Sequence, residues 1–214
     1  MIELYTSEGC SSCPPAENYL NKFKQNQGLW KKYVPLAFHV NYWDYLGWKD
    51  KYADPLYTQR QRQHAAVNSA RTIYTPGFFV NGQTWRMGFF NSIPSPDTQS
   101  VGNLQVKYRK GVIEADFKPI GKMDRLLELN VAILGMELKS NIEAGENEGR
   151  YSSHDFVVLG YEKTPGNNNH WLVNQPVIKN ITATSYGLAV WLSKIGQPVP
   201  LQATGGFVEI GKNR

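Results

Sequence analysis

The chain has 214 residues, of which 41% are hydrophobic and 13% aromatic, and a formal net charge of +5 at pH 7. This composition excludes a disordered chain and is typical of a folded protein with a sizeable core. Lysines and arginines are dispersed and no nucleic-acid-binding module is recognisable, so we expect no nucleic-acid partner. No apolar run approaches the roughly 20 residues that cross a bilayer, so we expect no membrane span.

The first predicted elements surround the two cysteines of the chain, Cys10 and Cys13. Residues 2–5 have the pattern of a short strand. From Ala16 onward apolar side chains recur at helical spacing, and the two prolines after Cys13 suit the first turn of a helix. Cys10 therefore lies at the helix entrance, where unpaired N–H groups and the helix dipole favour a thiolate. Cys13 is close enough to form a small disulfide ring with it.

Three interpretations of this pair are open. A zinc site needs further ligands, and because there are no other cysteines and the four histidines are scattered, we expect no metal site. A static disulfide across so short a loop would constrain the unfolded chain little. A redox-active dithiol fits a strand, turn and helix best. We expect no organic cofactor.

The next segment contains a strand, an aromatic loop and a helix. Residues 33–40 are apolar nearly throughout, which predicts a strand inside a sheet, with His39 favoured as a core histidine over a proton shuttle. The loop 41–50 is rich in aromatic residues, which either cap a core edge or line a binding groove. Asp54 is a suitable N-cap for a helix that continues over 56–67.

A hairpin follows. Residues 78–80 predict a strand, and Asn81-Gly82 predicts a tight turn into a returning strand over 83–88. Pro76 stands just before a strand of central character, where it cannot donate to the ladder. A cis peptide bond between Thr75 and Pro76, in a tight turn, would explain this placement.

This order of elements resembles the thioredoxin fold, in which a cis-proline faces the dithiol. Three stretches resemble the DUF1223 family more closely, a family of thioredoxin-like, mostly bacterial proteins that are usually made with a signal sequence. These stretches are LYTSEGCSSCPPA at 4–16, AFHVNYWDYLGWKD at 37–50, and YTP at 74–76 with VNG at 80–82. The resemblance covers mainly residues 1–90.

The resemblance implies roles for particular residues. Cys10 would be the exposed nucleophile, Cys13 the resolving thiol and Pro76 the cis-proline beside them. The family's export implies a periplasmic or secreted protein whose leader is absent from this chain. We expect a disulfide-containing protein or peptide as substrate and a separate redox partner. The residues expected to contact the substrate are Thr75, Ser11, Ser12, Trp43, Asp44 and Trp48.

The second half of the chain has a different pattern. A stretch rich in proline, serine and asparagine over 91–97 predicts a boundary between a domain at 1–96 and another at 97–214. Beyond it apolar and polar residues alternate in several segments separated by polar turns, which predicts half-buried antiparallel strands. The sequence therefore predicts an α/β thioredoxin-like domain followed by an all-β antiparallel sandwich domain that packs on it.

The predicted function is that of a thiol–disulfide oxidoreductase. A Cys10 thiolate would attack a substrate disulfide, and Cys13 would resolve the mixed disulfide. Glu17 lies on the same helical face and is a possible proton acceptor, although a solvated glutamate is favoured. This interpretation requires that the sulfurs be reachable from solvent.

Two alternatives belong to other classes. One is a non-catalytic exported module that binds a peptide or partner through the Trp43 to Trp48 loop and holds a static disulfide. The other is a Cu(I)-handling protein that uses two thiolates and His39.

Overall fold

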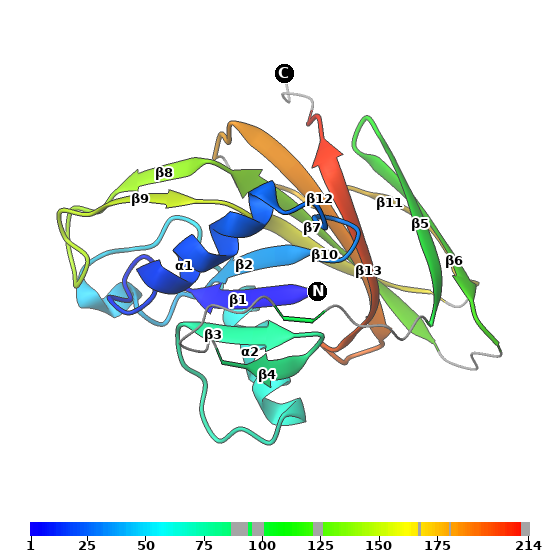
Figure 1. The fold of residues 1–214 in the computed structure, drawn as a ribbon, viewed down its shortest axis with the longest axis horizontal. Helices are drawn as coiled ribbons and strands as arrows, with labels where there is room; N and C mark the ends of the chain where they lie inside the picture. The colour runs from blue at the N-terminus through cyan, green and yellow to red at the C-terminus, as the bar shows by residue number, and fades with distance from the viewer. Residues whose placement is uncertain (87–93, 96–100, 122–125, 167, 180, 211–214) are drawn as a thin grey trace.

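The computed structural model describes residues 1–86, 94–95, 101–121, 126–166, 168–179 and 181–210. Most of the elements are strands (Figure 1). In chain order they are β1 (Ile2–Thr6), α1 (Pro14–Asn21), η1 (Lys22–Gln25), β2 (Pro35–His39), η2 (Asp44–Leu46), α2 (Pro55–Val67), β3 (Gly77–Val80), β4 (Gln83–Trp85), β5 (Gly102–Arg109), β6 (Val112–Pro119), β7 (Leu127–Met136), β8 (Leu138–Asn141), β9 (Tyr151–His154), β10 (Val157–Gly166), β11 (His170–Asn174), β12 (Ser185–Lys194) and β13 (Pro200–Val208).

One mixed sheet runs through both halves of the chain. Its eight strands follow the order β13-β12-β7-β10-β2-β1-β3-β4, so strands from the second half extend the sheet begun by β1 and β2. The junction is a parallel pairing of β10 with β2, at Val157 and Ala37. A three-stranded sheet, β11-β6-β5, and the hairpin β8-β9 complete the described strands.

Helices α1 and α2 lie on opposite faces of this sheet. Successive side chains of a strand point to opposite faces. On β1, Thr6 reaches Glu17 of α1, whereas Glu3 reaches Arg60 of α2. The carboxyl ends of the parallel strands β1 and β2 therefore meet beside the start of α1, which is where open α/β sheets usually hold their ligands.

Strand β7 is buried along its whole length because both of its faces are covered. Ala132 and Leu134 belong to the core that also contains residues of β1, β2 and α1. Val131 and Ile133 belong to a second core, shared with β5, β6 and β12. The alternating pattern predicted half-buried strands, and for β7 this is wrong, since the three-stranded sheet covers the face that would otherwise meet solvent.

The predicted fold class is wrong. The protein is mostly β with a large mixed sheet, and not a thioredoxin-like α/β domain followed by a separate sandwich. The local elements of the first half were nevertheless predicted well, including the first-turn prolines of α1, the Asp54 N-cap of α2 and the β3-β4 hairpin. The error is one of assembly, because β10 occupies the sheet edge beside β2.

Two predictions remain as predictions. Most of the expected boundary over 91–97, and residues 87 and 88 of the expected returning strand, lie outside the described residues. The division into 1–96 and 97–214 is therefore still a prediction.

Among the residues that the structure describes, no helix combines the length and apolar character needed to cross a bilayer.

Candidate functional site

The two cysteines form a disulfide at the turn between β1 and α1. Their Cα atoms are 5.5 Å apart, and Cys13 is the N-cap of α1. Ser11 and Ser12 are exposed, and the Ser12 hydroxyl lies 3.3 Å from the Cys10 sulfur. Cys10 and Cys13 themselves are only 1% and 0% exposed. The expectation that Cys10 is exposed is therefore wrong.

The loop between β8 and β9 covers this turn. The Asn147 side-chain amide donates to the carbonyl oxygens of Glu8 and Cys10, at 2.8 and 2.9 Å. The Ser11 amide donates to a Glu146 carboxylate oxygen at 3.2 Å. Asn147 is buried, whereas Glu146 is exposed. These three hydrogen bonds hold a segment from the second half of the chain against the cysteines.

Glu8 and Glu17, which flank the two cysteines in the sequence, form a buried pair with a histidine between them. His154 Nε2 is 3.2 Å from Glu8 Oε1, and His154 Nδ1 is 3.2 Å from Glu17 Oε2. The Thr6 hydroxyl donates to the other Glu17 oxygen at 2.6 Å. The expectation that Glu17 is a solvated helix residue is wrong, since it is 7% exposed.

These contacts shift the ionisation of the group. Burial alone would lower the pKa of His154, but the carboxylates of Glu17 and Glu8 raise it to about 10. Burial alone would raise the pKa of Glu17, yet His154 beside it holds that pKa below its ordinary value. The imidazolium and carboxylate forms therefore stabilise each other.

A second buried pair adjoins the first. His39, at the end of β2, places Nδ1 2.7 Å from Asp50 Oδ2, and Asp50 also accepts from the backbone amides of Glu8 and Tyr52. Burial would raise the pKa of Asp50, but His39 and these donors lower it. The His39 and His154 rings lie edge to face, with centroids 5.3 Å apart. The two acid–imidazole pairs thus form one buried cluster.

Three members of this cluster are potential metal ligands. Glu17, His39 and His154 each offer a ligand atom, and these atoms lie within 4.8 Å of one another. Glu114, Asp116 and His170 form a second such group, but they lie at the surface of the three-stranded sheet and are more exposed.

The aromatic loop packs against the cysteine turn. A Cβ atom on Gly9 would lie 3.1 Å from Cβ of Trp43, and the Trp43 indole donates to the Thr75 hydroxyl at 2.7 Å. The Trp48 indole donates to Glu8 at 2.8 Å. Asp44 accepts from the Asp50 amide at 3.3 Å, which ties the two ends of its own loop together.

The structure thus places most of the predicted site residues around one turn. The predicted cis peptide bond between Thr75 and Pro76 is confirmed. The role of Pro76 beside the disulfide stays a prediction, as do the substrate contacts proposed for the other residues. The two tryptophans are half-buried and use both indole N–H groups internally.

The sequence did not predict that four further side chains meet at the site. These are the side chains of Glu8, Asp50, Asn147 and His154. His154 and Asn147 reach the turn only because β9 and its loop fold back over α1. No local sequence pattern predicts this contact, because the two segments are more than a hundred residues apart in the chain.

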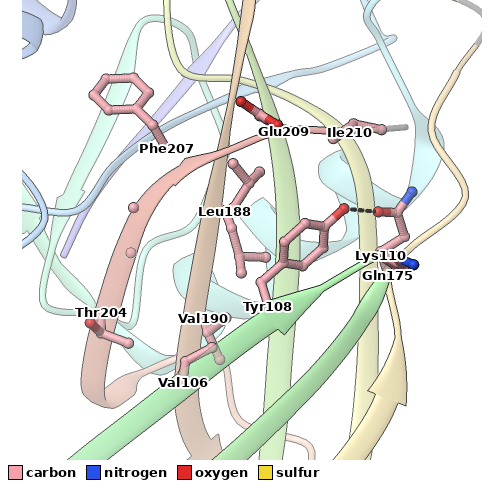
Figure 2. A pocket seen from close by; sticks show the side chains of 14 residues that line it. Val106, Tyr108, Lys110, Gln175, Leu188, Val190, Thr204, Phe207, Glu209 and Ile210 are labelled. Carbon is pink, nitrogen blue, oxygen red and sulfur yellow. Dashed lines mark hydrogen bonds between the residues drawn. The ribbon is translucent and has the colours of Figure 1, made fainter. Parts of the chain in front are cut away.

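A separate groove of about 1060 Å³ lies at the other end of the molecule, between β5 and β13. Figure 2 shows Val106 and Tyr108 of β5 facing Leu188 and Val190 of β12, with the Tyr108 hydroxyl donating to Gln175 at 2.6 Å. Its lining, among the described residues, includes none of the predicted site residues.

Comparisons with known proteins show the fold and the family. The chain matches no curated protein. It resembles the crystal structure of a structural-genomics target protein from Agrobacterium tumefaciens, with a TM-score of 0.69 and 22% identity over 100% of this chain and 95% of that one. A family model described as "Protein of unknown function (DUF1223)" matches residues 1–193, which include the cysteine turn and His154. The chain therefore belongs to the DUF1223 family.

Proposed function

We propose that this chain exchanges thiols and disulfides through the Cys10–Cys13 pair. The observation that carries the proposal is the buried cluster of Glu8, Glu17 and His154 beside the disulfide. Buried ionisable groups with shifted pKa values are costly and gather at reactive sites. A disulfide that closes so short a loop contributes only about 2 kcal/mol to stability by the chain-entropy relation, which is a weak reason to keep it for structure alone.

The exchange conserves atoms and electrons. In the reduced protein, the Cys10 thiolate attacks one sulfur of a substrate disulfide, which releases the other sulfur as a thiolate. Cys13, after losing its proton, attacks Cys10 and releases the second substrate thiol. The substrate gains two electrons and the protein returns to the disulfide. A dithiol partner then reduces the pair again.

The buried cluster handles the proton of Cys13 in this scheme. Glu17 lies one helical turn after Cys13 on the same helix, and His154 bridges Glu17 and Glu8. The Glu17 carboxylate would accept the proton of the buried thiol and return it, with a basicity that the neighbouring imidazolium lowers. In the reduced protein, the start of α1, whose N-cap Cys13 lies three residues after Cys10, would favour the Cys10 thiolate.

Access to the sulfurs requires movement of the segment that carries Asn147. Because both cysteines are buried, a substrate reaches Cys10 only when the hydrogen bonds of Asn147 and Glu146 to the turn are broken. Ser11 and Ser12 are already exposed and would meet the substrate first. The backbone at Thr75, before Pro76, would pair with an extended substrate segment. We place the protein in the periplasm or outside the cell, where disulfides persist.

Trapping tests this function directly. A Cys13→Ser variant cannot resolve the mixed disulfide, so it should accumulate proteins joined to Cys10 that are released by reductant. A Cys10→Ser variant is the matched control and should trap far less. Equal or absent trapping by both variants would contradict the proposal.

The second candidate is a non-catalytic binding module with a permanent disulfide, and the burial of both sulfurs favours it. In that case the native protein should keep its disulfide in dithiothreitol.

A stoichiometric amount of copper on the reduced chain would instead indicate Cu(I) handling.

A further inference from the structure

Three ligand atoms converge in the interior, between α1, β2 and β9. Those of Glu17, His39 and His154 lie within 4.8 Å of one another, and Glu17 Oε2 is 3.2 Å from His154 Nδ1. Metal bonds of 2.0–2.1 Å in a tetrahedral site place neighbouring ligand atoms about 3.3 Å apart. One edge of the triangle therefore already has the spacing of a zinc site, and the third ligand atom lies within 4.8 Å of the other two.

The free ring nitrogens have the character of metal ligands. Asp50 accepts a hydrogen bond from His39 Nδ1, so the remaining lone pair of a neutral His39 ring lies on Nε2. That Nε2 is buried and has no hydrogen-bond partner, in a side chain that is 0% exposed. His154 Nδ1 likewise makes no aligned hydrogen bond, although Glu17 is 3.2 Å away. A proton or a metal ion between this nitrogen and the carboxylate oxygen would satisfy both atoms.

Each of the three residues is held by a partner on its other polar atom. Asp50 fixes His39 through Nδ1, Glu8 fixes His154 through Nε2, and the Thr6 hydroxyl fixes the second oxygen of Glu17. Metal-binding histidines almost always donate their second N–H group to a carboxylate or carbonyl in this way. In the second group of potential ligands, which is more exposed, Glu114 accepts from Lys107 at 3.1 Å and His170 Nδ1 lies 2.8 Å from Asp116.

The surroundings favour a cation. Three buried carboxylates, of Glu8, Glu17 and Asp50, face two imidazole rings. A polar surface hollow of about 340 Å³ lies next to the cluster and is lined by Glu17 together with Asn18 and Ser153. Glu17 therefore lines both the hollow and the inner site.

We propose that Glu17, His39 and His154 bind a divalent transition-metal ion, with Zn²⁺ as the ion that best fits two imidazoles and one carboxylate. The disulfide takes no part in this coordination, so metal binding does not require the exchange reaction, but an ion bound to Glu17 and His154 would keep them from accepting the Cys13 proton. The scattered sequence positions of its ligands explain why ligand spacing predicted no metal site.

The test uses the full-length, oxidised chain, stripped of metal with a chelator and then freed of the chelator. Zn²⁺ alone is added, and binding is measured by calorimetry and by elemental analysis after gel filtration. The wild type should bind one ion per chain. Glu17→Gln and His39→Gln should weaken binding by more than tenfold, and Asp50→Asn, which touches only the second atom of His39, by roughly 10–100-fold.

His170→Gln is the matched control, because it removes a histidine from the exposed group and should leave binding unchanged. Circular dichroism establishes which variants are folded. If the buried variants do not fold, the melting temperature of the wild type is measured instead, and it should rise with zinc concentration. A wild type that binds no zinc, folded Glu17 and His39 variants that bind it normally, or loss of binding in His170→Gln would each overturn the proposal.

Discussion

At the scale of single residues, we expect Asn147 to control whether the disulfide is reachable. Its side chain makes two hydrogen bonds to the cysteine turn, and each contributes about 0.5–1.5 kcal/mol net. Asn147→Ala should therefore favour the open conformation and raise the rate at which dithiothreitol reduces the native disulfide by roughly 5–100-fold.

The comparison needs a matched variant that leaves the turn untouched. Asn103→Ala changes an exposed asparagine on β5 and should reduce at the wild-type rate. If Asn147→Ala is reduced no faster than Asn103→Ala, the loop between β8 and β9 does not control access to the sulfurs.

At the scale of elements, an ion pair joins β1 to α2. The Arg60 guanidinium donates to both carboxylate oxygens of Glu3, at 2.8 and 2.9 Å, and also reaches the Tyr161 hydroxyl and the Pro198 carbonyl oxygen. His64 lies 3.1 Å from the same carboxylate. Because Arg60 bonds to the segment before β13 as well as to β1, this pair connects the first and second halves of the chain.

Stability should fall in acid partly because of Glu3. Burial alone would raise the pKa of Glu3, but Arg60 and His64 hold it well below its ordinary value of 4.5. A carboxyl with a depressed folded-state pKa contributes stability that is present above pH 4.5 and is lost as the pH falls towards the folded-state pKa. The Tyr5 hydroxyl, which donates to the same carboxylate, stays protonated over this range.

Glu3→Gln should remove this part of the acid dependence. It should also destabilise the protein by about 3–5 kcal/mol at neutral pH, because it leaves Arg60 buried without its counter-charge. Urea unfolding between pH 3 and 7 measures both effects. An exposed glutamate, in Glu162→Gln, is the control and should leave the curve unchanged. A Glu3→Gln variant with the wild-type acid dependence would contradict the assignment.

The sequence predicted those helices and strands that depend on neighbouring residues. Periodicity, first-turn prolines and the Asp54 cap fix α1 and α2, since these depend on neighbouring residues. The Asn81-Gly82 turn fixes the β3-β4 hairpin for the same reason. The pairing of Val157 with Ala37 is a contact between distant segments, and no local pattern specifies it. The candidate site divides in the same way, because the cysteine turn is local and the contribution of His154 is not.

At the scale of the whole molecule, the shared sheet makes the two halves depend on each other. The core around β1 and β2 contains Leu134, Phe156, Val158 and Trp191, all from the second half. A fragment of residues 1–96 would expose this apolar surface and the edge of β2. We expect such a fragment to aggregate or to unfold without cooperativity, as judged by circular dichroism and urea titration. A soluble fragment with a sharp transition would show that the first half folds alone.

A cavity in the second core should destabilise both halves of the molecule together. Ile133→Ala removes a fully buried side chain of β7 and should cost about 2–5 kcal/mol. Because β7 and β10 connect that core to β2, the Trp fluorescence and far-ultraviolet dichroism of the variant should change in a single transition. Two separate transitions would indicate that the halves unfold independently.

The central claim is that the Cys10–Cys13 bond is reversible in the folded protein, and its reduction potential tests this most directly. The native chain is equilibrated with dithiothreitol buffers of graded potential, thiols are counted by alkylation, and circular dichroism confirms that the fold is retained. The account predicts a reversible transition in the range of known exchange proteins, roughly −270 to −120 mV, with the fold intact. A disulfide that persists below about −300 mV, or that is lost only when the chain unfolds, would contradict it.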